Sequence, residues 1–159
     1  GAIAVGRGVD AEVINTIAVG AAGSAIAYAD PSMARVPENS ILQTAGPIEV
    51  PVVHWGDPDG EAPKFYAEDI AAGLFAEYVG QSSELQAGPT PESLFMDARN
   101  DDLTLMRQSP ARAFARIDRV PEHDYNRSLR TVDDAAADAG AIELTPPYNA
   151  VRSTWTMYH

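Results

Sequence analysis

Residues 52–73, VVHWGDPDGEAPKFYAEDIAAG, pass within one short stretch from a strand-like run through a turn into a helix-like run. The strand-like run extends from Ile48 to Trp55 and so begins before this stretch. It is rich in β-branched and aromatic residues, which are typical of strands. Pro51 lies inside this run and cannot donate to a β ladder, so we expect the strand at a sheet edge or at a bulge. The exposed backbone of an edge is a natural place for a partner strand.

A helix is the clearest element that the sequence predicts, and it covers residues 63–79. Pro63 suits a first helical turn, and Gly80 supplies the stop. Apolar side chains recur at helical spacing and form one stripe: Tyr66, Ile70, Leu74 and Tyr78, widened by Phe65, Phe75 and Val79.

Shorter patterns lie on both sides of this helix. Apolar runs predict brief strands at 2–5, 24–28, 41–44 and 103–107, and an alternating pattern predicts a closing strand at 151–158. Start signals and apolar spacing predict shorter helices at 91–98 and 125–140. Residues 9–21 fit either a helix or a strand, because their apolar spacing is helical while their β-branched content disfavours a helix.

This order of elements predicts an α+β fold with a mostly antiparallel sheet. The alternative is an α/β fold that opens with a βαβ unit, which requires residues 9–21 to be the helix. A chain of 159 residues that is 45% hydrophobic matches one globular domain, so we assign residues 1–159 to a single domain with a polar, Pro/Gly-rich loop at 81–91. No internal repeat at a fixed period is evident.

The charge of the chain restricts its partners. Twenty-three acids against eleven bases give a formal charge of −12, which repels phosphate backbones and anionic membranes. We therefore expect neither a nucleic acid nor a membrane as partner. No run approaches the roughly 20 apolar residues of a spanning helix, so we expect a soluble protein. The start of the chain lacks the pattern of a signal peptide, and Gly1 is consistent with a processed N-terminus or a tag remnant.

One candidate for a cofactor site is a glycine turn near the start of the chain. Gly6 and Gly8 satisfy the pattern G-x-G-x-x-A after an apolar run, and Asp30 falls where a dinucleotide fold places its ribose acid. Against a nucleotide site, Asp10 would place a negative charge beside the pyrophosphate. The simpler interpretation is a glycine turn, and we expect no cofactor.

The turn after the strand at 48–55 is a second candidate, this time for catalysis. His54 could act as a general base oriented by Asp57 or Asp59, and His123 could meet it across the fold. The pattern around Asp57 fails the register of a calcium loop, and no second His stands at ligand spacing, so we expect no metal site. The simpler interpretation is that Asp57 and Asp59 shape a turn.

A local basic run offers a candidate interaction surface. Arg112, Arg116 and Arg119 would share one face of a helix, either paired with acids in solvent or docked on an acidic surface such as another copy of this chain. Cysteine is absent, which excludes thiol chemistry.

We therefore expect a noncatalytic assembly or binding subunit, such as a self-associating building block of an oligomer or viral particle. A small nucleotide-binding enzyme that uses the turn at Gly6-Arg7-Gly8, and a small hydrolase or lyase that uses His54 and nearby acids, remain the alternatives.

Overall fold

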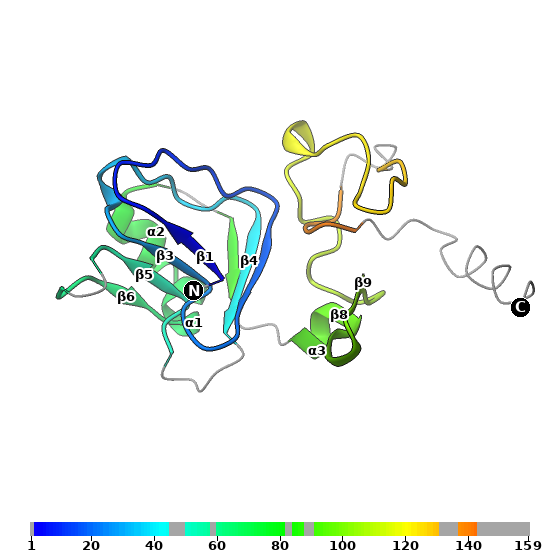
Figure 1. The fold of residues 1–159 in the computed structure, drawn as a ribbon, viewed down its shortest axis with the longest axis horizontal. Coiled ribbons are helices and arrows are strands. Elements are labelled where there is room, and N and C mark those ends of the chain that lie inside the picture. The colour runs from blue at the N-terminus through cyan, green and yellow to red at the C-terminus, as the bar shows by residue number, and fades with distance from the viewer. Residues whose placement is uncertain are drawn as a thin grey trace, which may run out of the picture.

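The computed structural model of the chain describes residues 2–44, 50–57, 60–81, 84–87, 91–130 and 137–142. Two sheets fill its first half, and they share one apolar core (Figure 1). The four-stranded sheet has the order β1-β3-β5-β6, made of β1 (Ile3–Val5), β3 (Ile26–Tyr28), β5 (Val53–Trp55) and β6 (Lys64–Phe65). The three-stranded sheet has the order β2-β4-β7, made of β2 (Ile17–Gly20), β4 (Ser40–Thr44) and β7 (Leu85–Ala87).

Successive strands from β1 to β5 alternate between the two sheets, so the chain winds as a coil. Each strand reaches its neighbour only after the chain has crossed the other sheet, and the neighbours consequently run parallel. In these two sheets β6 is the antiparallel member, paired with β5.

This topology corrects the expected fold class. The prediction of an α+β fold with a mostly antiparallel sheet is wrong, because the fold is mixed α/β with mostly parallel strands. The alternative βαβ unit is wrong as well. Although β1 and β3 are parallel, the residues between them form an irregular segment and then β2, which belongs to the other sheet.

Side chains that alternate along the strands build the shared core. Ile26, Val53 and Tyr28 are fully buried on the inner face of the four-stranded sheet, and Leu42 meets them from the three-stranded sheet. Leu42 and its neighbour Ile41 point to opposite faces of their strand, as successive strand residues must. Ile41 therefore enters a second apolar cluster on the far face.

The second cluster joins the C-terminal half of the chain to the three-stranded sheet. Its members besides Ile41 come from residues 94–139: Leu94, Leu105, Ala111, Ala115, Ala137 and Ala139. Figure 1 shows this half lying beside the sheet that contains β4. Parallel sheets are usually covered on both faces, and this sheet follows that rule.

The helix predicted at 63–79 is divided in the structure. Residues 64–65 form β6, and two short helices follow, α1 (Ala67–Ala71) and α2 (Leu74–Val79). Gly73 separates the helices with φ of 76°, a left-handed conformation that glycine adopts without steric cost. Because the helix is interrupted, the predicted apolar stripe does not stay on one buried face. Phe75 is buried, while Leu74 is 47% exposed.

The strand predicted at 48–55 is β5, but it is not an edge strand. It begins at Val53, after Pro51, and lies between β3 and β6. The missing donor of Pro51 therefore does not affect the ladder, and the expectation of an edge or bulge at this strand is wrong.

Short elements make up the C-terminal half. They are α3 (Pro91–Leu94), β8 (Phe95–Asp97) and β9 (Asp102–Leu105), and 3₁₀ turns lie at Pro31–Met33, Ala98–Asn100 and Ile117–Arg119. The predicted strand at 103–107 is confirmed as β9, which pairs antiparallel with β8. The helix expected at 91–98 is confined to α3, and residues 125–130 and 137–140 of the second expected helix are not helical. The strand predicted at 151–158 lies outside the described residues.

Among the residues that the structure describes, no helix is both long enough and apolar enough to cross a membrane.

Gly20, at the end of β2, is required by a close backbone approach. A Cβ atom at this position would lie 2.1 Å from the carbonyl oxygen of Gly23 and 2.6 Å from that of Ser24. We expect Gly20→Ala to lower the free energy of unfolding by about 1–3 kcal/mol, because the bend after β2 must move. Chemical denaturation of both proteins measures the difference.

Gly6→Ala is the matched control for this substitution. Its Cβ would meet only Val9 Cγ2, at an ordinary 3.8 Å. We expect a change within about 0.5 kcal/mol for an unstrained surface site. Equal losses for Gly6→Ala and Gly20→Ala would contradict the close approach at Gly20.

Candidate functional site

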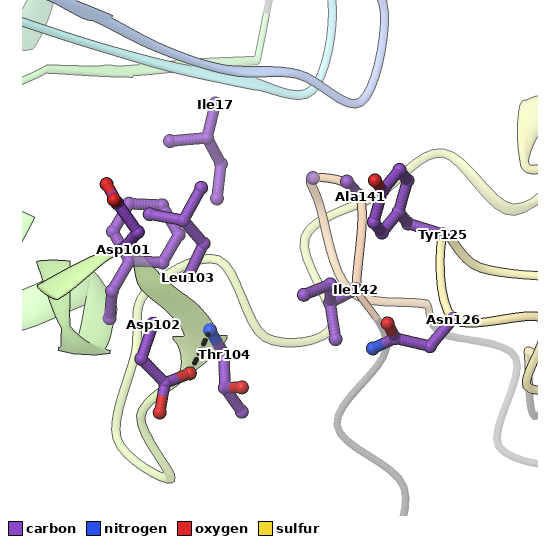
Figure 2. A pocket seen from close by; sticks show the side chains of 11 residues that line it. Ile17, Asp101, Asp102, Leu103, Thr104, Tyr125, Asn126, Ala141 and Ile142 are labelled. Atoms are coloured by element: carbon purple, nitrogen blue, oxygen red, sulfur yellow. Dashed lines mark hydrogen bonds between the residues drawn. The ribbon is translucent and has the colours of Figure 1, made fainter.

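A groove of about 540 Å³ opens where β9, the residues around Tyr125 and the segment 140–142 meet above β2 (Figure 2). Figure 2 shows Asp101, Asp102, Leu103 and Thr104 on one side, and Tyr125, Asn126, Ala141 and Ile142 on the other. Ile17 of β2 and Phe95 of β8 complete the apolar lining.

Apolar side chains at the groove are unusually accessible. Tyr125 is 81% exposed and Leu103 is 51% exposed. Acidic residues stand beside them, since Asp101 and Asp102 also line the groove. The groove can therefore hold an apolar group, and it places negative charge next to that group.

The edge of β9 borders this groove. Side chains of a strand alternate between its two faces, so a cavity that touches one face meets every second residue. Here four consecutive residues, 101–104, line the cavity, which indicates that it runs along the edge of the strand. β8 and β9 form a two-stranded sheet among the described strands. The amides of Leu103 and Thr104 donate locally, to the carbonyl oxygen of Asp101 at 3.1 Å and to Oδ1 of Asp102 at 3.1 Å.

A second cavity, of about 360 Å³, contains His123 and a set of buried charges. Arg130, Asp124 and Asp138 line it, and each is less than 10% exposed. The guanidinium of Arg130 donates to the carbonyl oxygens of Asp138, at 3.0 Å, and Gly140, at 2.7 Å. Asp138 in turn accepts from the backbone of Ala113 at 2.9 Å. These contacts hold the segment 137–142, which forms part of both cavities.

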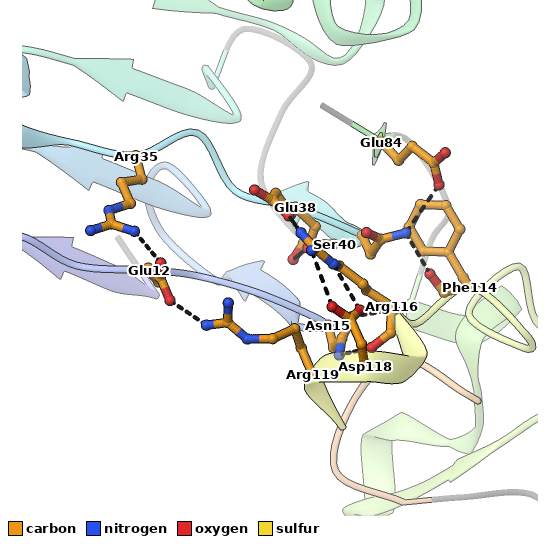
Figure 3. A network of polar contacts seen from close by, with 11 residues as sticks. Glu12, Asn15, Arg35, Glu38, Ser40, Glu84, Phe114, Arg116, Asp118 and Arg119 are labelled. Carbon is orange, nitrogen blue, oxygen red and sulfur yellow. Dashed lines mark hydrogen bonds and ion pairs between the residues drawn. The ribbon is translucent and has the colours of Figure 1, made fainter. Parts of the chain in front are cut away.

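Ion pairs and hydrogen bonds at the surface connect the C-terminal half to the part of the chain that forms the two sheets (Figure 3). Arg116 Nη1 lies 2.5 Å from Glu38, and its Nε lies 2.8 Å from Asp118. Asn15 and the backbone of Arg116 exchange hydrogen bonds of 2.6 and 3.0 Å, and Arg119 pairs with Glu12. The hydrogen bonds from Arg116 hold the pKa of Asp118 below its ordinary value.

This network changes the interpretation of the predicted basic patch. Residues 112–119 do not form an α-helix, so Arg112, Arg116 and Arg119 do not share a helix face. Arg116 and Arg119 pair with acids of the same chain, and Arg112 donates to the carbonyl oxygen of Arg107 at 2.8 Å. The patch therefore acts at a contact within the chain; its role toward a partner stays a prediction.

Parallel pairing brings two of the predicted sites together. Val5, Tyr28 and Trp55 are in register, so the residues that follow β1, β3 and β5 gather at one end of the sheet. Arg7, between Gly6 and Gly8, lies 2.5 Å from Asp57. This end is the usual ligand position of an open parallel sheet.

Asp30 lies at the same end, where it caps a turn. Its Oδ1 accepts from the backbone of Ser32 at 3.0 Å, a bond that lowers the pKa of Asp30, as does the charge of Arg7. No helix follows Gly8 in the described residues 9–16, so the helix N-terminus on which the expected phosphate site depended is not formed there.

The predicted catalytic residues lie in different places. His54 stands on the outer face of the four-stranded sheet, in a cross-strand row with Ala27 and Lys64, and it lines neither of the two cavities. His123 lines the second cavity, and Asp59 lies outside the described residues. The Nε2 atom of His54 is buried and has no hydrogen-bond partner in the described part of the chain. Within that part, no group of three or more His, Asp or Glu residues could hold a metal ion.

The groove itself was not predicted from the sequence. Tyr125 was assigned to the apolar stripe of a helix, and Leu103 to a strand whose surroundings were unknown. The signal in the sequence is the pair Asp101 and Asp102 at the start of β9, because charged residues on a strand are typical of exposed edges.

Comparison of the chain with family models, curated proteins and solved structures finds no match. The fold and the groove define its class by themselves: a chain of two mainly parallel sheets that carries an apolar groove along the edge of a short strand.

Proposed function

We propose that this chain is a noncatalytic assembly or binding subunit, and that the groove beside β9 is its contact surface. The observation that carries the proposal is the exposure of Tyr125 and Leu103 at an apolar groove of about 540 Å³. Exposed apolar surface of this kind marks sites where a protein or ligand docks, since covering it removes apolar area from water.

A protein partner suits the shape and charge of the groove. The apolar side chains that line the groove offer pockets to the side chains of a docked segment. Asp101 and Asp102 favour a segment that is neutral or basic. The net charge of −12 disfavours nucleic acid and anionic membrane as partners.

Other copies of the chain are the partner that we propose. Self-association would place a patch of one copy against the groove of another, as in the closed or open assemblies that identical subunits form. The test is the mass of the native particle, measured by light scattering on a size-exclusion column over a range of concentrations. We expect a mass above the 16.9 kDa of one chain, rising with concentration until assembly is complete.

Leu103→Asp should weaken this association. Covering a leucine side chain contributes about 1.5–3 kcal/mol, so its loss raises the dissociation constant by roughly 10- to 100-fold. Leu74→Asp is the matched control, because Leu74 is similarly exposed, at 47%, and lies on α2 away from the groove.

A strict monomer at high protein concentration would overturn the proposal. Equal weakening by Leu103→Asp and Leu74→Asp would keep self-association and remove the groove as its surface.

A further inference from the structure

A tight loop, residues 123–129, contributes to one wall of the groove and is held by its own backbone. The amide of Asp124 donates to the carbonyl oxygen of Ser128 at 2.9 Å. The carbonyl oxygen of Asp124 accepts from the amide of Arg127 at 3.0 Å, and its Oδ1 accepts from the amide of Ser128 at 2.8 Å. A loop fixed in this way can dock without a large loss of conformational entropy.

This loop combines exposed apolar side chains with a positive charge. Tyr125 is 81% exposed although it lines the groove, and Leu129 is 60% exposed. Arg127 lies between them in sequence and is exposed as well. Within the part of the chain that the structure describes, the guanidinium of Arg127 has no ion pair and no hydrogen bond.

The opposite wall of the groove carries complementary groups. Figure 2 shows Asp101 and Leu103 across the groove from Tyr125 and Asn126. Leu103 is 51% exposed, Asp101 is exposed, and the carboxylate of Asp101 has no ion pair among the described residues. One wall is therefore apolar and acidic, and the loop on the other wall is apolar and basic.

Few cations of this acidic chain are available to a partner. Most arginines bind carboxylates or carbonyl oxygens of their own chain: Arg7, Arg35, Arg99, Arg112, Arg116, Arg119 and Arg130. Arg127 is not among them, and it directly follows Asn126 of the groove lining. Two copies that each carry a charge of −12 repel, so a contact between them requires opposite charges to meet locally.

We propose that two copies associate about a twofold axis, with the 123–129 loop of each copy against Asp101 and Leu103 of the other. Because the loop and these two residues belong to opposite walls of one groove, a single twofold axis makes both contacts at once. Arg127 then pairs with the partner's Asp101, and Tyr125 covers the partner's Leu103. This inference rests on the proposed function and names the residues and the symmetry through which the copies join.

Charge reversal on each side of the contact tests the arrangement. Asp101→Arg alone, or Arg127→Glu alone, places like charges at both contacts of the dimer. Each variant should raise the dissociation constant by about 10- to 100-fold, since two attractions become two repulsions. Light scattering on a size-exclusion column over a range of concentrations measures it.

Mixing the two variants distinguishes a contact between copies from one within a chain. In a mixed dimer each new charge faces an opposite charge, so both contacts are attractive again. We expect the equimolar mixture to associate within about threefold of the wild-type dissociation constant. Mixing does not restore a pair that forms inside one chain, so a mixture as weak as its components contradicts the inference.

Lys64→Glu is the matched control. It makes the same change of charge as Arg127→Glu, and Lys64 is exposed on β6 and lines neither cavity. We expect its dissociation constant to stay within about threefold of the wild-type value. Thermal denaturation checks that each variant is folded. If a reversal variant unfolds, Asp101→Asn and Arg127→Gln replace the reversals, and each should then raise the dissociation constant by about 3- to 10-fold.

The wild-type particle separates this inference from the proposed function. We expect its mass to level off at twice the 16.9 kDa of one chain, because a twofold contact closes the assembly. A mass that rises further refutes the twofold arrangement. Association that neither variant weakens, or that mixing does not restore, refutes the loop contact and leaves self-association standing. A wild-type chain that stays monomeric refutes both.

Discussion

Replacing Phe75 by alanine is expected to lower the free energy of unfolding by about 3–5 kcal/mol. Phe75 is 1% exposed and contacts the rings of Trp55 and Phe65, at centroid distances of 5.3 and 4.9 Å. Through these contacts Phe75 packs α2 against β5 and β6. Truncation removes the buried ring, leaves a cavity between these elements and loses both aromatic contacts.

Thermal and urea denaturation measure this loss, and the melting temperature should fall by roughly 10 °C for a chain of this size. Leu74→Ala is the control, since the adjacent Leu74 lies on the same helix with nearly half of its surface exposed. We expect Leu74→Ala to change stability by less than about 1 kcal/mol. A comparable loss in the two variants would mean that the predicted apolar stripe, rather than the observed break at Gly73, describes the helix.

Replacing Arg130 by methionine should have an effect of similar size in the C-terminal half. Arg130 is 6% exposed, and its guanidinium donates to the carbonyl oxygens of Asp138 and Gly140. The buried carboxylates of Asp124 and Asp138 line the same cavity. Removing the cation leaves the carbonyl oxygens of Asp138 and Gly140 without these charge-assisted donors, and two such hydrogen bonds contribute about 3–6 kcal/mol together.

The effect should be visible locally as well as globally. Hydrogen exchange at Gly140, whose amide donates to Asn15, should accelerate together with exchange at Ala139, whose amide donates to Ala111. Arg112→Met is the control, because Arg112 also donates to a carbonyl oxygen but is exposed. Its loss should cost less than about 1 kcal/mol. Unchanged exchange in Arg130→Met would show that the segment 137–142 is held by other contacts.

Five of the nine described strands were predictable from the sequence. The stretch that contains β2 was left open between helix and strand, and β6, β7 and β8 lie in stretches that were predicted as helix or loop. The predicted runs at 2–5, 24–28 and 48–55 each contain a strand of the structure, and those at 41–44 and 103–107 overlap β4 and β9. Such short runs can be located because β-branched and apolar residues pack well on a pleated surface. The relative direction of paired strands cannot be predicted in the same way, because an apolar run has the same pattern in a parallel and in an antiparallel sheet.

The sequence analysis also did not detect the repeated separation between paired strands. Ile3 and Ile26 pair at a separation of 23 residues, and Ile17 and Ile41 at 24. β4 and β7 pair only after 45 residues, because β5, β6, α1 and α2 intervene. β3 and β5 pair at 27 residues, from Ile26 to Val53. Separations that differ in this way do not produce a fixed period.

Candidate sites were predicted less well than strands, because a site depends on residues that are far apart in sequence. Arg7 and Asp57 are 50 residues apart and meet only because β1 and β5 flank the same strand. The hydrolase or lyase alternative required His54 to line a pocket with His123. In the structure His54 stands on the outer face of one sheet, and His123 lines a cavity of the C-terminal half. The groove combines residues from five separate stretches of the chain, and no local sequence pattern indicates that they meet.

The sequence by itself determined the acidic surface, the absence of thiol chemistry, the positions of most strands and the strand-like alternation of 151–158. These are local or compositional properties, and neighbouring residues are sufficient to specify them. Tertiary structure alone decided that the strands run parallel, that the helix at 63–79 breaks at Gly73, and that Arg116 and Arg119 bind acids of their own chain. The strand pairing and the ion pairs of Arg116 with Glu38 and of Arg119 with Glu12 depend on contacts between residues far apart in sequence, which a local pattern does not contain. The break at Gly73 uses a left-handed backbone conformation that the helical spacing of the apolar residues does not reveal.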